Sequence, residues 1–208
     1  MKQNKSIKII GITGGVGAGK SVVLGYLEEN YPCEVLVADT IGNEVKAPGG
    51  RCYKAFIELL GEDIVMPDGN IDRAKAAERI FADDKMLDKV NALIHPAVQD
   101  EIFERIAEFE KNGKVKFVFI EAALLIEAGY VQYLDELWYV CAGENLRKKR
   151  LEENRGYSAE RIEGIMENQL EDEEFRQYAD RILFNNGTKQ ELTKQIDEIM
   201  GEYTWQEQ

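Results

Sequence analysis

The sequence predicts an α/β protein with a parallel sheet of about five strands flanked by helices, a helical insertion and a charged lid segment. Three observations predict this fold. Short apolar runs rich in β-branched residues alternate with helical patterns along the 208 residues, which is typical of a parallel sheet covered on both faces. A glycine-rich stretch joins the first apolar run to the first helical pattern. Two long segments interrupt the alternation, and they predict the insertion and the lid.

The first strand is expected at residues 8–13, where the apolar run KIIGIT ends in glycines. A helix over 20–30 follows, because its apolar residues recur at helical spacing. The last helix, over 188–203, opens with Thr188 and Glu191 at the spacing of a capping box. Four further strands are expected at residues 34–39, 115–120, 136–142 and 181–184.

The second and third strands are separated by about 75 residues, far more than an ordinary crossover connection. Helical patterns at 73–81 and 96–112 predict a helical insertion at the ligand edge of the sheet. The highly charged residues 145–177 predict either a solvated helix pair or a mobile lid. The expected division is a core of residues 1–46, 115–142 and 178–208, an insertion of 47–114 and a lid segment of 143–177.

The net charge of −13 excludes a broadly basic nucleic-acid binder and argues against adhesion to anionic membranes. The longest apolar stretch, 115–129, contains charged residues and cannot span a bilayer. With His95 as the single histidine and no paired cysteines, a Cys/His zinc site is also excluded. The odd cysteine count favours a reducing compartment. We therefore expect a cytoplasmic monomer or small homo-oligomer that binds neither nucleic acid nor membrane.

Residues 14–21, with the sequence GGVGAGKS, satisfy the pattern G-x-x-x-x-G-K-[ST] between a predicted strand and a predicted helix. Glycines let successive backbone N–H groups surround phosphate oxygens, and the helix N-terminus adds partial positive charge. Lys20 can neutralise the β- and γ-phosphates, and the Ser21 hydroxyl can ligate Mg²⁺. The pattern predicts a P-loop NTPase-type core; the alternative is a glycine-rich helix entry without function. The glycine spacing disfavours a dinucleotide fold.

Asp39 ends the second predicted strand, so it is expected at the carboxyl edge of the sheet near the loop. A carboxylate there can accept and orient the proton of an acceptor hydroxyl beside the γ-phosphate. Alternatively, Asp39 is the N-cap of the helical pattern that follows. The N-K-x-D motif with which GTPases recognise guanine does not occur late in the chain.

Five blocks of the sequence resemble the dephospho-CoA kinase family, in the same order and over nearly the whole chain. They are residues 11–21, Ala38-Asp39 with Pro48-Gly49, residues 68–73, residues 91–96 and residues 124–127. Further matches are Arg150, Gln169, Ala179-Asp180 and residues 185–187. The loop is shared by many NTPases, whereas the blocks at 68–73 and 91–96 are more particular to this family.

The resemblance implies ATP-dependent phosphorylation of the ribose 3′-hydroxyl of dephospho-CoA to give CoA and ADP, with Mg²⁺. It implies Lys20, Asp39 and Arg150 as catalytic residues and Ser21 and Glu121 as metal ligands. The residues implied for ATP binding are Gly15, Val16, Gly17, Ala18, Gly19, Lys20, Ser21, Val22, Arg150, Arg155 and Asn185. The residues implied for acceptor binding are Asp39, Asp72, Arg73, His95 and Glu127.

The sequence departs from the family pattern at three places. Val37 stands where the family usually has the first of two acids, and Glu121 and Ala123 stand where it often has aspartate and proline. Asn154 occupies the position of a second lid arginine, with Arg155 beside it. A shift of one residue turns a helical side chain by about 100° around the axis, so Arg155 can replace that arginine only if the lid bends there.

Other interpretations of these residues stay open at this point. His95 can cap or pack between helices, the basic residues 147–155 can form a solvated face, and Glu127 can cap or line the sheet edge. Two other functions also fit the loop: a different small-molecule kinase, such as a nucleoside or nucleotide kinase, or a nucleotide-dependent binding switch.

Overall fold

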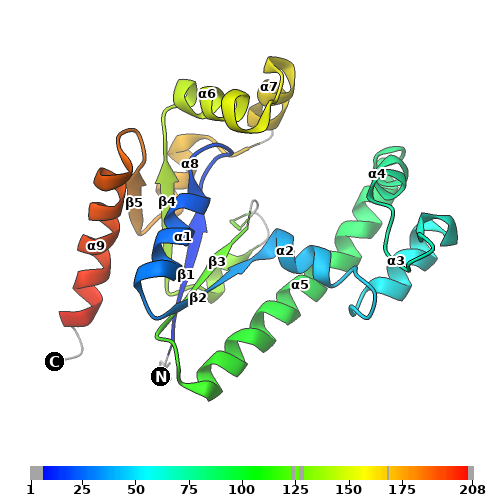
Figure 1. The fold of residues 1–208 in the computed structure, drawn as a ribbon, viewed down its shortest axis with the longest axis horizontal. Coiled ribbons are helices and arrows are strands. Elements are labelled where there is room, and N and C mark those ends of the chain that lie inside the picture. Colours follow the sequence, from blue (N-terminus) through cyan, green and yellow to red (C-terminus); the bar gives the residue numbers. More distant parts are fainter. Residues whose placement is uncertain (1–6, 123–124, 127–128, 168, 206–208) are drawn as a thin grey trace. The chain divides into compact units, whose positions relative to one another are not determined.

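The structure, a computed structural model, describes residues 7–122, 125–126, 129–167 and 169–205. The chain divides into two compact units, one of Met1–Val35 with Gly113–Gln208 and the other of Leu36–Asn112. The first unit carries the glycine-rich loop and most of the sheet, and the second is helical (Figure 1). Residues 36–46, which the sequence placed with the core, belong to the helical unit in this division.

The sheet has five strands in the order β2-β3-β1-β4-β5. Their bounds are β1 Lys8–Thr13, β2 Cys33–Val37, β3 Phe117–Glu121, β4 Glu136–Cys141 and β5 Arg181–Phe184. The pairs β1–β3, β1–β4 and β4–β5 are parallel. Strands β1, β3 and β4 are buried over almost their whole length, as expected for a sheet covered on both faces. The predicted fold class is confirmed.

Three strands differ from the prediction at their ends, and one of them, β4, differs only in ending at Cys141 rather than at residue 142. The second strand ends at Val37 rather than at residue 39, because Ala38 and Asp39 already belong to a helix. An acidic side chain in the first helical turn is favoured by the helix dipole, so the sequence EVLVAD divides between strand and helix. The third strand begins at Phe117, where it pairs with Lys8, and includes Glu121, which pairs with Ile12.

The helices of the first unit are α1 Lys20–Asn30, α6 Glu144–Arg155, α7 Ala159–Glu167, α8 Asp172–Tyr178 and α9 Lys189–Trp205, with a short 3-10 helix η2 at Tyr130–Tyr133. The predicted capping box before α9 is confirmed, because the Glu191 carboxylate accepts from the Thr188 backbone N–H and the Thr188 hydroxyl accepts from that of Glu191. The charged segment 145–177 forms three helices in the described residues, α6, α7 and α8, rather than a helix pair.

Aromatic side chains pack on both faces of β4. Trp138 and Tyr139 are consecutive strand residues, so their side chains point to opposite faces of the sheet. The ring of Trp138 meets Phe119 with 5.5 Å between ring centroids. On the other face, the ring of Tyr139 stacks on Phe175 of α8 at 4.9 Å. This packing fixes β4, whose Val140 carbonyl oxygen lies next to Gly14 in the loop that follows β1.

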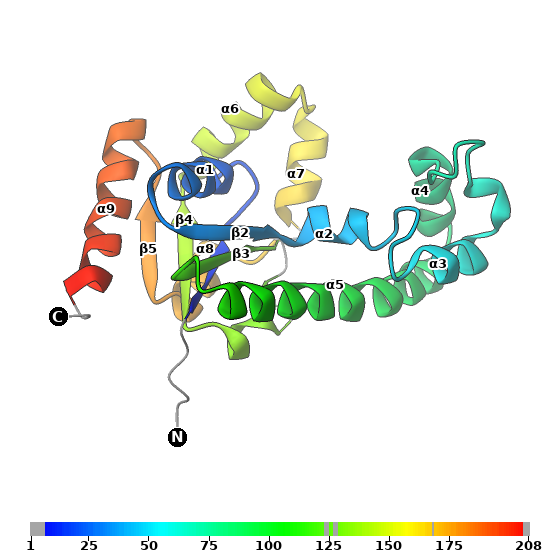
Figure 2. The same cartoon turned by 60° about the horizontal axis from the view of Figure 1, so that its bottom comes forward.

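The second unit is built on the long helix α5, along which the other helices pack (Figure 2). Its elements are α2 Ala38–Glu44, α3 Tyr53–Leu60, the 3-10 helix η1 Glu62–Ile64, α4 Arg73–Phe81 and α5 Asp84–Asn112. The predicted helix over 73–81 is confirmed. Residues 96–112 are helical as predicted, but the helix begins earlier, at Asp84, so that Pro96 lies inside α5. Proline removes one backbone hydrogen bond from a helix interior, and packing against α2 and α4 compensates for it. None of the helices in the described ranges has an apolar stretch long enough to cross a membrane.

Candidate active site

Residues 14–19 connect β1 to α1 as a tight loop. Gly14, Gly17 and Gly19 have φ angles of 142°, 78° and 98°, which side chains other than hydrogen strongly disfavour. A Cβ atom on Gly14 would also come within 2.5 Å of the Val140 carbonyl oxygen on β4. The glycines are therefore required both by backbone conformation and by the close approach of β4.

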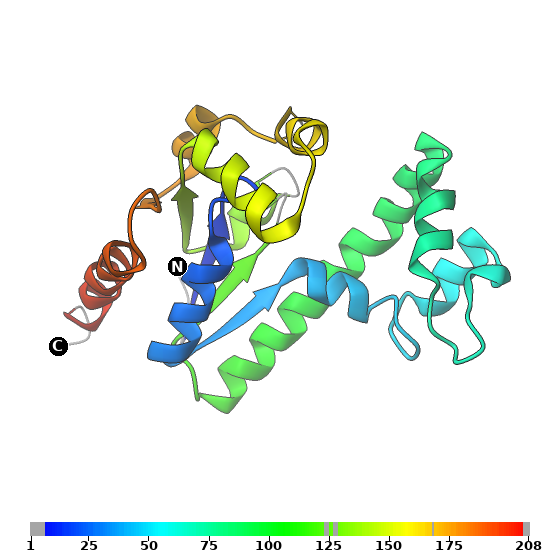
Figure 3. The ribbon, with the colours of Figure 1, turned by 45° about the horizontal axis from the view of Figure 1, so that its top comes forward.

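Helix α6 lies directly beside the loop and the N-terminal end of α1 (Figure 3). A Cβ atom on Gly17 would come within 2.9 Å of the Arg147 backbone oxygen and 3.2 Å of the Leu151 side chain. A Cβ atom on Gly15 would overlap the Arg147 guanidinium group. The loop is thus enclosed between β4 and α6, and a guanidinium group lies against one of its glycines.

Lys20 begins α1 and folds back over the loop. Its Nζ atom donates a 2.7 Å hydrogen bond to the Gly14 carbonyl oxygen and lies 3.5 Å from the Glu121 carboxylate. The two charged side chains are only 15% and 14% exposed, so this ion pair is less screened by water than a surface pair. The structure thus brings the predicted catalytic lysine and the predicted metal ligand Glu121 together at the loop. Ser21 follows on the exposed side of the helix N-terminus.

Arg150 and Asn185 bind the carbonyl oxygens of the loop. The Asn185 side-chain N–H donates a 2.7 Å bond to the Ala18 carbonyl oxygen, and Asn185 is one of the few buried polar residues. Arg150 donates to the Asn185 carbonyl oxygen at 3.0 Å and to those of Gly17 and Ala18 at 3.4 Å. Both predicted ATP-site residues therefore fix the backbone of the loop through its carbonyl oxygens.

Asp39 lies in the first turn of α2 and is exposed. The N-cap of α2 is Val37, and no side chain caps this helix. The alternative interpretation of Asp39 as an N-cap is therefore wrong. Its carboxylate has no capping task, which leaves it available for an acceptor.

The other residues predicted to bind the acceptor have different surroundings. The Asp72 carboxylate caps α4 by accepting from the backbone N–H groups of Ala74 and Lys75 at 3.1 and 3.2 Å. Arg73 follows it and lines a cavity. His95 is exposed on α5, so it does not pack between helices. Glu127 lies outside the described residues.

Known proteins resemble this chain over most of its length. The family model for dephospho-CoA kinase matches residues 8–191. A protein named dephospho-CoA kinase from Geobacter sulfurreducens is 36% identical over 193 residues, which cover 93% of this chain and 97% of that relative. The chain belongs to the dephospho-CoA kinase family. The resemblance of its motifs to this family is confirmed.

Solved structures share the fold of this family member. A structure from Thermus thermophilus has a TM-score of 0.78 and 29% sequence identity, and the match covers 95% of this chain and 98% of the Thermus chain. Dephospho-CoA kinase from Campylobacter jejuni has a TM-score of 0.67 at 22% identity, with coverage of 92% and 96%. Both comparisons show that solved structures share the fold of this chain over nearly its whole length.

Two residues at the loop were missed as site residues by the sequence analysis. The Nε atom of Arg147 is buried and has no hydrogen-bond partner within the described ranges, while its guanidinium group lies against Gly15. Arg147 precedes Arg150 by three residues, so both lie on one face of α6. This spacing from a predicted ATP-binding arginine is the sequence feature that could have identified Arg147 as a site residue. The Gln169 side-chain oxygen accepts a 2.9 Å bond from the Val16 backbone N–H. Gln169 thus accepts a hydrogen bond from a backbone N–H group of the phosphate-binding loop. The sequence analysis named Gln169 only as a match to the dephospho-CoA kinase family.

Arg155 ends α6 and is exposed, with no hydrogen bond or ion pair to the parts of the chain that the structure describes. Gly156, which follows it, has a φ of 62° and terminates the helix. The helix therefore ends directly after Arg155. Whether this dephospho-CoA kinase family member uses Arg155 as a lid arginine stays a prediction.

Proposed function

We propose that this chain transfers the γ-phosphoryl group of ATP to the ribose 3′-hydroxyl group of dephospho-CoA, giving CoA and ADP in the last step of coenzyme A synthesis. The observation that carries this proposal is a complete phosphate-binding loop in a chain that the dephospho-CoA kinase family matches over residues 8–191. In the reaction, the hydroxyl oxygen forms a bond to the γ-phosphorus. The bond from that phosphorus to the oxygen bridging the β-phosphate breaks, and ADP leaves.

The loop and Lys20 bind the transferring group. Phosphoryl transfer has a loose transition state, so an enzyme contributes mainly in-line positioning and charge neutralisation. The loop N–H groups and the Lys20 ammonium supply that charge close to the γ-phosphate. Lys20 is held over the loop by Gly14 and Glu121, so its position is set before ATP binds.

Asp39 accepts the proton of the 3′-hydroxyl group and orients that hydroxyl. Its position directly after β2, its exposure and its freedom from capping support this role. Asp72, Arg73, His95 and Glu127 are proposed to surround the acceptor. Arg150, Arg155 and the rest of residues 143–177 act as a lid that excludes water when both substrates are bound.

Mg²⁺ fits the residues beside the loop. Ser21 and Glu121 offer a hydroxyl and a carboxylate oxygen, which are hard ligands of the kind Mg²⁺ prefers, and this ion usually takes only one or two protein ligands beside substrate phosphates. When bound with ATP, it would neutralise charge on the β- and γ-phosphate oxygens. Glu121 lies 3.5 Å from the Lys20 Nζ atom, so its carboxylate stands beside the lysine proposed to neutralise the phosphates.

A panel of acceptors with coupled detection of ADP tests the proposal. We expect dephospho-CoA to stimulate ADP release far above nucleosides, nucleotides and shikimate, and ATP alone to be hydrolysed slowly. A preference for a nucleoside or nucleotide would identify a different small-molecule kinase. Equal rates with and without any acceptor would rule out a kinase and favour a nucleotide-dependent binding switch.

Arg147 is predicted to bind the phosphates of ATP. Its guanidinium group lies against Gly15, and its Nε atom lacks a hydrogen-bond partner in the described structure. Since a hydrogen bond to a charged group contributes about 1.5–3 kcal/mol, Arg147→Gln should raise the KM for ATP by about 10- to 100-fold while leaving the KM for dephospho-CoA unchanged. Steady-state kinetics with each substrate varied in turn measures both constants.

Lys149→Gln is the matched control on the same helix, because Lys149 is 66% exposed and pairs only with Glu153 at 3.8 Å within the described residues. This control should keep the wild-type KM for ATP. An unchanged KM in Arg147→Gln would show that the guanidinium group supports the loop without contacting the nucleotide.

A further inference from the structure

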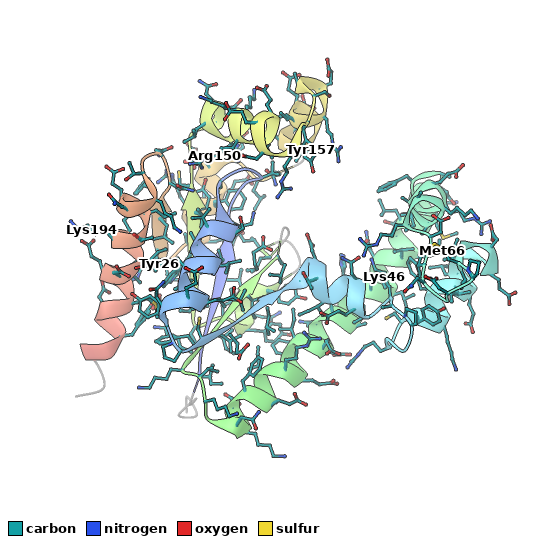
Figure 4. All side chains as sticks on the ribbon, viewed as in Figure 1. Tyr26, Lys46, Met66, Arg150, Tyr157 and Lys194 are labelled. Carbon is teal, nitrogen blue, oxygen red and sulfur yellow. The ribbon has the colours of Figure 1, made fainter. Side chains whose placement is uncertain are left out.

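The helical unit contains a cavity of about 660 Å³ between the end of α2, α3 and α4. This volume lies within the range of small-molecule sites. Two of its lining residues are large apolar side chains that are exposed, Met66 at 39% and Phe81 at 76%. Lys46 and Arg73 line the same cavity. Figure 4 labels Lys46 and Met66 at the same end of this unit. The cavity therefore combines an accessible apolar wall with two cations, beside the Asp72 carboxylate, which accepts hydrogen bonds from the first turn of α4.

Neither cation has an ion-pair partner within 4.0 Å among the residues that the structure describes. Lys46 is half-buried, and its Nζ atom lies 5.8 Å from the centre of the Phe56 ring. Burial lowers the pKa of the Lys46 ammonium group, the neighbouring Arg73 lowers it further, and Asp39 opposes both effects. Two cations that repel each other in a partly buried cavity are stabilised by an anion that binds between them.

The position of Lys46 relative to Asp39 indicates which anion this is. Asp39, Asn43 and Lys46 are spaced by four and three residues along α2 and the turn that follows it, a spacing that places side chains on one side of a helix. Asn43 also lines the cavity. A ligand anchored at Lys46 and Arg73 therefore extends along this side toward the carboxylate proposed to orient the acceptor hydroxyl.

We propose that Lys46 determines acceptor specificity: together with Arg73 it binds the diphosphate group of dephospho-CoA, and the apolar wall at Met66 and Phe81 takes the pantetheine arm. This inference rests on the proposed function for the identity of the acceptor. The match is chemical, since the acceptor joins a doubly charged diphosphate to a long uncharged arm, and the cavity joins two cations to an apolar wall. Charged phosphate and guanidinium or ammonium groups form strong, charge-assisted hydrogen bonds.

Calorimetric titration without ATP tests the proposal through binding alone. Lys46→Met should weaken the binding of dephospho-CoA about 10- to 100-fold, as expected for a lost hydrogen bond to a charged group. Lys46→Arg should retain most of the affinity. The fragments 4′-phosphopantetheine and pantetheine differ only in one phosphate, so Lys46→Met should weaken the first and leave the second unchanged.

Lys54→Met is the matched control, since Lys54 is exposed on α3 and does not line the cavity; it should bind all three ligands as the wild type does. Unchanged dephospho-CoA affinity in Lys46→Met, or an equal loss for pantetheine and its phosphate, would overturn the proposal. A different result would contradict the proposed function, namely that the wild-type protein binds dephospho-CoA but does not phosphorylate it.

Discussion

Asp39→Asn should abolish most phosphoryl transfer and leave ATP binding intact. An asparagine keeps the size and one oxygen of the side chain, but it cannot take the proton of the 3′-hydroxyl group. Since a positioned base contributes about 10²- to 10⁴-fold to rate, we expect kcat to fall by that factor while the Kd for ATP stays at the wild-type value. Steady-state kinetics and nucleotide titration measure the two quantities.

The stability of Asp39→Asn separates this role from a structural one. The Asp39 side chain does not cap α2, so the variant should melt within about 1 °C of the wild type. Glu44→Gln is the control on the same helix; Glu44 pairs with Arg105 across to α5, and loss of a surface pair costs at most about 1 kcal/mol. That variant should keep the wild-type kcat. Wild-type turnover in Asp39→Asn would disprove the assignment of Asp39 as the base.

The phosphate-binding loop could be predicted in full because its requirements are local. The positive φ angles of Gly14, Gly17 and Gly19 and the start of α1 follow from eight consecutive residues. The five strands could be predicted because short apolar runs differ from their surroundings, most clearly at β1, β3 and β4, which are buried over almost their whole length. The end of β2 could not, because the same residues favour strand by their apolar character and helix by the acid at Asp39.

The start of α5 depends on tertiary packing. Pro96 favours a helix start by its fixed φ angle and missing N–H, but contacts with α2, α3 and α4 extend the helix back to Asp84. Arg147 and Lys46 illustrate the same limit at the site. The sequence shows that both residues are cationic, but only the packing of α6 against the loop and the cavity of the helical unit give these side chains a defined place.

Lys20→Ala should cause a large loss of ATP-dependent activity. The Lys20 side chain is 15% exposed and its Nζ atom lies 2.7 Å from the Gly14 carbonyl oxygen, so its charge acts in a poorly solvated site where a fixed charge is effective. We expect kcat/KM for ATP to fall by at least about 10²- to 10³-fold, the effect of removing one fixed donor to a developing charge. Initial rates at limiting ATP measure this ratio.

Lys20→Arg should fail to restore that activity, although it keeps the positive charge. A guanidinium group is planar and wider than an ammonium group, and the place of the Lys20 Nζ atom is confined by Gly14 and by Glu121 at 3.5 Å. Lys194→Ala, a change at a side chain 78% exposed on α9, should leave the rate unchanged. Full activity in Lys20→Arg would mean that charge alone suffices at this position, whereas full activity in Lys20→Ala would exclude the loop as the site of catalysis.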